Sequence, residues 1–287
     1  DPTSTSATSK VLWELTPAST GAAELGFSYS RPVIVKSNAA VSGNNEGATK
    51  WVAIFGNGYN SYSGEAVLFI VDIGTGEVIR TISTKSNVAS AQPDPFVPNG
   101  LNTPAAVFAD SNFTADYVYA GDLRGNLWKF DLSSSNPDNW SVAYGTAITE
   151  PESSSYDPKP LFVAEDAQGD AQPITATPVV GGHPQGRDGL MLYFGTGKYI
   201  ERADSTNTDR QSFYGVWDKD LCEVGGDLRA CILIPPNESR RHHRVEFDRS
   251  NLVAQNISAQ TDSEREVTDL NVDWNTQYGW YLDFPAQ

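Results

Sequence analysis

One polar loop, residues 110–116, has the only spacing of oxygen-bearing side chains in this sequence that is typical of a metal site. Asp110, Asn112 and Asp116 fall within seven residues, between two short strands expected at residues 105–108 and 117–120. Carboxylate and amide oxygens are the ligands that a hard cation such as Ca²⁺ prefers. The sequence therefore offers one candidate cation site, and the alternative is a loop closed by its own side chains.

The two cysteines, Cys222 and Cys231, form a second candidate site. Residues 225–227, Gly-Gly-Asp, can turn the chain back between them, so the pair can close a disulfide across a hairpin. The loop-entropy relation gives such a bond about 2.5 kcal/mol of stabilisation. The alternative is two free thiols, but an acidic chain that is poor in cysteine and rich in Ser, Thr and Asn is typical of an exported protein, where disulfides persist.

Other familiar chemical motifs are missing or incomplete. The glycine pairs at residues 56–58 and 195–197 end expected strands without opening a helix, so we interpret them as turns and not phosphate loops. His183, His242 and His243 have no partner at ligand spacing, so zinc is not expected. No Gly-x-Ser-x-Gly elbow occurs. We therefore expect no catalytic and no cofactor-binding residues, and no enzyme.

The elements that must position these residues are short strands in a unit that occurs three times. Each copy has a proline, a small apolar strand, a second strand ending in glycine and an aromatic strand ending in aspartate. The prolines are 72 and 74 residues apart, at Pro32, Pro104 and Pro178, and the aromatic strands end at Asp72, Asp131 and Asp218. A multi-strand unit that recurs at a fixed period predicts an all-β fold built from propeller blades.

We expect residues 1–10 to be a linker or disordered end and residues 11–287 to form one β-propeller domain. Its repeats are expected at about 31–82, 103–144 and 175–234, with partial blades at 11–15 and 252–287. Residues 272–274 and 280–284 are expected to be strands of a further blade, and residues 36–50 a surface loop. Three repeats with a fragment at each end do not close a ring, so we expect the ring to be incomplete in this chain.

Charge limits the classes of partner. The chain has 20 Lys and Arg against 36 Asp and Glu, a net charge of −16, which argues against nucleic acid and anionic membrane surfaces. No run of 18 apolar residues occurs, so no membrane span is expected. The chain starts at Asp1 without Met or an apolar leader, which predicts a mature or excised piece. Residues 235–249 form a basic island, which we interpret as a solvated loop or as a docking site for an acidic partner.

The strand sequences also resemble a known family. Five segments are similar to the C-terminal domain of PilY-type proteins, the adhesins and biogenesis factors at the tips of bacterial type IV pili: residues 51–79, 100–132, 193–204, 211–218 and 272–285. The resemblance implies a modified β-propeller with quinoprotein-like blades and an extracellular, pilus-tip location reached through the periplasm. It also implies a non-enzymatic binding and assembly module that supports pilus extension, surface attachment and twitching motility.

The partners that the resemblance implies are minor pilins of the tip complex, and a host-cell or abiotic surface bound through an N-terminal region that is absent here. Family members also commonly have a calcium loop. An ungapped alignment places its ligand positions on Phe108, Asp110, Asn112, Thr114 (by its carbonyl) and Asp116. Phe108 replaces the first carboxylate, and Phe113 replaces the glycine of the turn. We therefore expect weak or no Ca²⁺ binding and no other cofactor.

Two other functions remain open from the sequence. One is a structural propeller scaffold of the cell envelope that has no link to pili. The other is a quinoprotein dehydrogenase, whose strands are similar but which needs a larger ring and, in the alcohol-oxidising class, an adjacent cysteine pair. The cysteines here are nine residues apart, and a shared fold does not transfer an activity.

Overall fold

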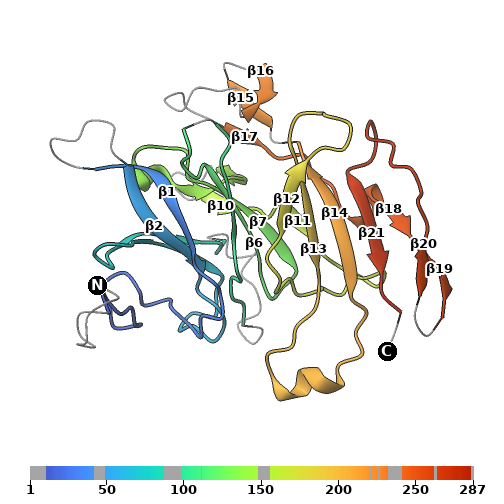
Figure 1. The fold of residues 1–287 in the computed structure, drawn as a ribbon, viewed down its shortest axis with the longest axis horizontal. Helices are drawn as coiled ribbons and strands as arrows, with labels where there is room; N and C mark the ends of the chain where they lie inside the picture. Colours follow the sequence, from blue (N-terminus) through green and yellow to red (C-terminus); the bar gives the residue numbers. More distant parts are fainter. Residues whose placement is uncertain are drawn as a thin grey trace. The chain divides into compact units, whose positions relative to one another are not determined.

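The computed structural model describes residues 11–41, 49–86, 98–110, 112–147, 156–219, 221–224, 227–231, 241–261 and 264–285. Over these residues the chain is all-β apart from short 3₁₀ turns, as the strand patterns predicted (Figure 1). The helices among them are η3 (Pro137–Asn139), η4 (Arg202–Thr206) and η6 (Arg249–Asn251). In this described part, no helix has the length and apolar character that crossing a membrane requires. The chain divides into two compact units, residues 1–118 with 130–158 (unit 1) and residues 119–129 with 159–287 (unit 2).

Unit 1 contains the sheet of the first repeat. Its four strands pair in sequence order as an antiparallel meander: β1 (Val33–Ala40), β2 (Thr49–Gly56), β3 (Val67–Asp72) and β4 (Val78–Ser83). β2 and β3 lie in the middle of the sheet, and residues 52–56 and 67–71 on them form continuous buried runs, because both faces of the strands are covered there. Phe55 and Phe69 stack across the two strands with ring centroids 5.5 Å apart. The expected surface loop at 36–50 is partly wrong, since β1 extends to Ala40 and β2 begins at Thr49.

The expected outer strand at residues 11–15 is also wrong. These residues have no regular structure, but Trp13 and Leu15 pack on the core of unit 1. The indole N–H of Trp13 donates to the Ile73 carbonyl at 2.8 Å. Gly76 has φ +75°, and a Cβ there would lie 2.5 Å from the Trp13 ring. The apolar pattern therefore reflected packing of single side chains and not strand pairing.

The second repeat is built around the hairpin β6 (Tyr117–Gly121) and β7 (Asn126–Asp131), whose strands contribute residues to both units. In unit 1, β5 (Ala105–Val107) pairs with β6, β8 (Ser141–Val142) pairs with β7, and β9 (Gly145–Ala147) pairs with β10 (Tyr156–Pro158). In unit 2, β11 (Phe162–Val163) pairs with β7. The buried Asp122 accepts the backbone N–H groups of Arg124 and Asn126 and the indole N–H of Trp128, each at 2.8–2.9 Å. Gly125 takes φ +80°, as the turn chemistry predicted.

Unit 2 contains the sheet of the third repeat, with five strands side by side (Figure 1). Their order is β12 (Val179–Gly182), β13 (Leu190–Gly195), β14 (Ser212–Asp218), β21 (Gly279–Asp283) and β18 (Val253–Gln255). The prediction that β21 belongs to a further blade is therefore wrong, because it pairs antiparallel with β14. Side chains explain the pairing: Trp280 packs against Phe213 at 5.9 Å, and Gly215 leaves room for the indole ring.

Two further expectations for unit 2 are corrected. Residues 272–274 are irregular, and Trp274 is buried against Met191 and Trp217. The cysteine hairpin does not extend the sheet of the third repeat, because it forms a small separate sheet of β16 (Asp227–Ala230), β15 (Leu221–Val224) and β17 (Arg241–His243). The last pair of strands is β19 (Ile257–Gln260) with β20 (Arg265–Val267).

Candidate functional site

The candidate cation loop connects β5 to β6 in unit 1, and its own side chains bond to one another. Both oxygens of Asp110 accept from Asn112, Oδ1 from the backbone N–H at 3.0 Å and Oδ2 from the side-chain amide at 2.9 Å. Asn112 Oδ1 in turn accepts the backbone N–H of Thr114 at 2.7 Å and the Thr114 hydroxyl. Side-chain to backbone bonds of this kind are typical of turns that hold their shape without an ion.

Asp116 closes the other end of the loop and is buried, with 3% of its surface exposed. Its Oδ2 accepts the Ala109 N–H at 2.8 Å, and its Oδ1 accepts the side-chain amide of Asn38 at 3.1 Å. The same Asn38 amide lies 3.1 Å from the carbonyl oxygens of Ala115 and Leu132. Burial raises the pKa of Asp116, and the hydrogen bonds from Ala109 and Asn38 oppose that rise.

The loop brings the predicted residues Asp110, Asn112, Thr114 and Asp116 together, but it does not fit a calcium ion. Calcium takes six to eight oxygen ligands, whereas the carboxylate oxygens here already accept protein N–H groups. Phe108 stands at the first ligand position and is 49% exposed. Phe113 adopts φ 63°, the left-handed conformation that glycine normally takes in such a turn, and is 77% exposed. The loop has therefore kept the backbone turn without the full set of ligands.

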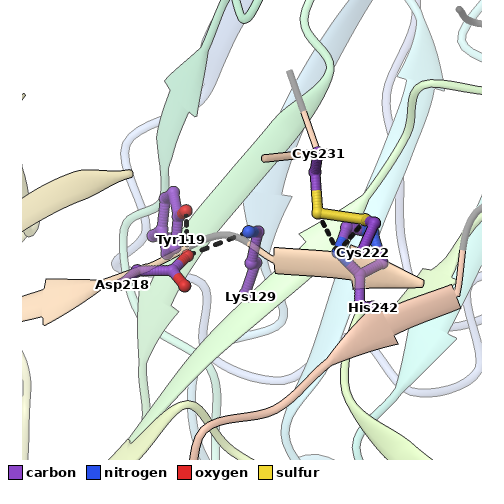
Figure 2. Close-up of a disulfide and its surroundings, with 6 residues drawn as sticks. All are labelled: Tyr119, Lys129, Asp218, Cys222, Cys231 and His242. Atoms are coloured by element: carbon purple, nitrogen blue, oxygen red, sulfur yellow. Dashed lines mark hydrogen bonds and ion pairs between the residues drawn. A yellow bond between two sulfur atoms is a disulfide. The ribbon is translucent and has the colours of Figure 1, made fainter. Parts of the chain in front are cut away.

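The two cysteines are joined in a disulfide, and both are buried (Figure 2). His242 of β17 lies beside this bond, with its Nδ1 3.4 Å from each sulfur. In the sequence His242 has no partner at ligand spacing, but the pairing of β17 with β15 brings His242 opposite Cys222. Sulfurs that share a disulfide are not thiolates, which are the form that ligates metals, so we assign the three residues a structural role.

A buried ion pair lies near the disulfide in unit 2 (Figure 2). Lys129 Nζ lies 2.9 Å from Asp218 Oδ2, and the two side chains are 0% and 2% exposed. The hydroxyl of Tyr119 donates to the same carboxylate oxygen at 2.6 Å. Because Tyr119 and Lys129 come from the β6–β7 hairpin and Asp218 ends β14, the pair ties two repeats of unit 2 together. The sequence patterns did not point to this ion pair.

Arg249, at the end of the basic island, forms a second charge cluster in unit 2. Its Nη2 donates to Asp283 Oδ2 at 2.6 Å, and its Nη1 donates to the Glu165 carbonyl at 3.0 Å and the Tyr214 hydroxyl at 2.8 Å. The guanidinium lies 3.7 Å from the centre of the Tyr281 ring. Burial by itself would raise the pKa of Asp283. The hydrogen bond and charge of Arg249 outweigh burial and lower this pKa. This part of the island is therefore engaged within the chain.

A groove of about 1060 Å³ lies beside η4 in unit 2 and is lined by side chains of both signs. Lys198 lies 2.9 Å from Asp204, and Asp166 accepts the backbone N–H groups of Gln168 and Asp170. Burial by itself would raise the pKa of Asp204. The hydrogen bond from the Glu201 backbone and the contact with Lys198 outweigh burial and lower this pKa to about 2. These charged groups of the groove therefore stabilise its own walls.

Successive, mainly antiparallel sheets, each made mainly of consecutive strands, place this chain in the class of β-propeller domains. The family model described as "PilY1 beta-propeller domain" matches residues 5–231. The chain belongs to the PilY1 β-propeller family, as the strand sequences suggested.

Two named proteins and one solved structure of this family are similar to the chain. A type IV pilus biogenesis factor PilY1 homolog of Xylella fastidiosa is 34% identical over 97% of this chain and 16% of its own length. The type IV pilus biogenesis factor PilY1 of Pseudomonas aeruginosa is 34% identical over 96% of this chain and 22% of its own length. The crystal structure of the P. aeruginosa PilY1 C-terminal domain matches with a TM-score of 0.72 and 31% identity, over 96% of this chain and 54% of that one. This chain thus spans about a fifth of the full length of these relatives.

Proposed function

We propose that this chain is a non-enzymatic binding and assembly module of a type IV pilus biogenesis factor, located outside the cell at the pilus tip. The observation that carries the proposal is the match of nearly the whole chain to proteins named as pilus biogenesis factors. In this role the chain supports pilus extension, and with it surface attachment and twitching motility.

The interior of the chain suits a rigid docking scaffold. The ion pair of Lys129 and Asp218, the Arg249 cluster and the disulfide all connect strands of unit 2 to one another. Rigid scaffolds place their binding residues on loops and strand edges. β12 is an edge of its sheet, Val179 on it is 64% exposed, and a Cβ on Gly182 would meet no atom within 4 Å. We assign this edge to a minor pilin that adds a strand to the sheet.

The candidate cation loop belongs to this scaffold and works without bound calcium. Its support is the set of internal bonds around Asp110 and Asp116. Micromolar CaCl₂ is therefore expected to leave the thermal midpoint of the chain unchanged. A steep rise of the midpoint in micromolar calcium, lost in Asp116→Ala, would contradict this assignment.

The test of location is to shear pili from cells that produce the full protein and to probe the sheared fraction with an antibody raised against this chain. We expect signal at pilus tips that disappears when the major pilin gene is deleted. Signal confined to the cell envelope and indifferent to pilin would instead favour the structural scaffold of the envelope. An immunogold count separates tip signal from signal along the pilus shaft.

A further inference from the structure

Unit 1 has an exposed aromatic surface that the scaffold described above does not use. Two segments form it, residues 26–30 and 58–64, and its rings are Phe27, Tyr29, Tyr59 and Tyr62; we call it the aromatic platform. Phe27 is 58% exposed, Tyr29 76% and Tyr62 96%, and Tyr59 is half-buried. Aromatic side chains contribute most to stability when buried, so several exposed together on neighbouring segments indicate a surface that binds a ligand.

Three of the four rings, those of Phe27, Tyr29 and Tyr59, lie against one another. Tyr29 stacks on Tyr59 with ring centroids 5.3 Å apart and planes 12° apart. Phe27 meets the Tyr59 ring edge-on at 5.8 Å. The ring of Tyr59 therefore contacts two rings of the neighbouring segment, whose outer faces remain open to solvent.

Backbone contacts hold the two segments in place. The Phe27 N–H donates to the Tyr59 carbonyl at 2.7 Å, and the Gly26 N–H donates to the Asn57 carbonyl at 3.0 Å. Gly58 has φ +71°, and a Cβ there would lie 2.1 Å from the Phe27 carbonyl oxygen. The close approach of the segments thus depends on glycine, and the rings of Phe27, Tyr29 and Tyr59 are in contact without a ligand. Such preorganisation lowers the entropy cost of binding.

The chemistry of the platform is uncharged although the chain has a net charge of −16. Apart from the four aromatic residues, the two segments contain only Gly, Ser and Asn. The nearby Glu24 carboxylate accepts hydrogen bonds from Ser63, and Glu65 pairs with Lys85 at 2.7 Å. Tyrosine mixed with Ser, Gly and Asn is also the composition of antibody binding loops, where rings supply contact area and small polar groups supply adaptable hydrogen bonds.

We propose that the aromatic platform binds a neutral glycan. A pyranose ring has one face of polarised C–H groups, which the negative face of an aromatic ring attracts, and hydroxyl groups around its rim that the exposed side-chain amide of Asn60 can bond. The lack of charge in both segments disfavours acidic polysaccharides. A proline-rich peptide is bound in a groove lined by aromatic rings, whereas Tyr29 and Tyr59 lie flat against each other. The inference deepens the attachment part of the proposed function and rests on it for its biological meaning.

The test uses the purified 287-residue chain and an immobilised panel of neutral hexasaccharides of glucose, galactose, mannose and N-acetylglucosamine. A sulfated glycan and a proline decamer are included as competing ligand classes. We expect at least one neutral hexasaccharide to bind, and Tyr29→Ala and Tyr62→Ala each to weaken it about tenfold with an unchanged thermal midpoint. Tyr199→Ala is the matched control, because Tyr199 is a tyrosine of unit 2 that is 81% exposed, and it is expected to bind as the unaltered chain does.

Three results would overturn the inference: no neutral glycan binds, the control variant weakens binding as much as the platform variants, or the sulfated glycan or proline peptide binds in preference. Because the assay uses purified protein, its outcome is independent of whether the chain is found at pilus tips. Glycan binding by a chain that is absent from pili would sustain the platform and refute the pilus location.

Discussion

Replacing Lys129 by methionine removes one charge of a fully buried ion pair and keeps most of the apolar stem of the side chain. The expected consequence is large, because Asp218 stays behind in a site where it is only 2% exposed and loses the positive charge of Lys129. Removing one partner of a buried pair typically costs about 3–5 kcal/mol of the free energy of unfolding. Tyr119 still donates to Asp218 at 2.6 Å, but a neutral hydroxyl does not replace a positive charge.

Lys85 provides the matched control. Its Nζ lies 2.7 Å from Glu65, closer than Lys129 lies to Asp218, but the Lys85 side chain is 44% exposed. Exposed pairs are worth about 0.2–1 kcal/mol because water screens them. If the distance between the charges decided the loss of stability, Lys85→Met would be the more destabilising change. Because burial decides it, we expect Lys129→Met to be the more destabilising change.

Urea unfolding followed by tryptophan fluorescence and circular dichroism measures both variants. The double variant Lys129→Met with Asp218→Asn removes the buried charge and keeps an acceptor for the Tyr119 hydroxyl, so we expect it to regain about half of the loss or more. The reasoning is refuted if Lys129→Met destabilises no more than Lys85→Met does. It is equally refuted if the double variant is less stable than Lys129→Met alone.

Three further predictions concern other parts of the chain. Phe113→Gly should raise the free energy of unfolding by about 1 kcal/mol, because glycine adopts positive φ without strain. Asn60→Gly, at φ 60°, should raise it less, because asparagine tolerates that conformation. Equal gains of the two variants in thermal melts would contradict this explanation. Replacing Cys222 and Cys231 by serine should lower the free energy of unfolding by about 2.5 kcal/mol. A thiol reductant should reproduce this loss in the unaltered chain. A free energy of unfolding that changes with neither the substitution nor the reductant would contradict a stabilising role of the disulfide. Burial, with a smaller contribution from a neighbouring arginine, lowers the pKa of His183 below 6.5, so the unfolded chain takes up its proton first. Stability should then be full above about pH 6.5 and fall as the pH drops below it, and His183→Gln should flatten that slope in urea unfolding at pH 7 and pH 5.

The strand patterns were sufficient to predict the central strands of each repeat. β3, β7 and β14 end at Asp72, Asp131 and Asp218, where the shared pattern placed the ends of the aromatic strands. These strands are recognisable because apolar and aromatic residues follow one another between turn residues, and that information is local in the sequence. The polar loop before β6 was found in the same way, and its two departures from the calcium pattern were visible as Phe108 at the first ligand position and Phe113 at the turn glycine.

Contacts between distant segments were not predictable in this way. Asn38, which bonds to Asp116 from β1, fell in a stretch expected to be a loop. Arg249 belonged to an island interpreted as a solvated loop or a docking site for an acidic partner, yet it reaches Asp283 on β21. In each case the partner is set by which strands become neighbours, and strand order is a property of the whole chain that no local pattern contains. Trp13 led to the opposite error, in which a strand was predicted where the structure has only a packed side chain. An apolar residue that packs singly and an apolar residue of a strand look alike in the sequence.

The most direct test of the central claim is to delete the segment that encodes this chain from the gene of the full protein and to count pili on the cell surface by electron microscopy. If the chain serves pilus biogenesis, surface pili are lost or sharply reduced, while pilin is still made, and a copy of the intact gene restores them. Cells that keep a normal number of pili without this segment would contradict the claim.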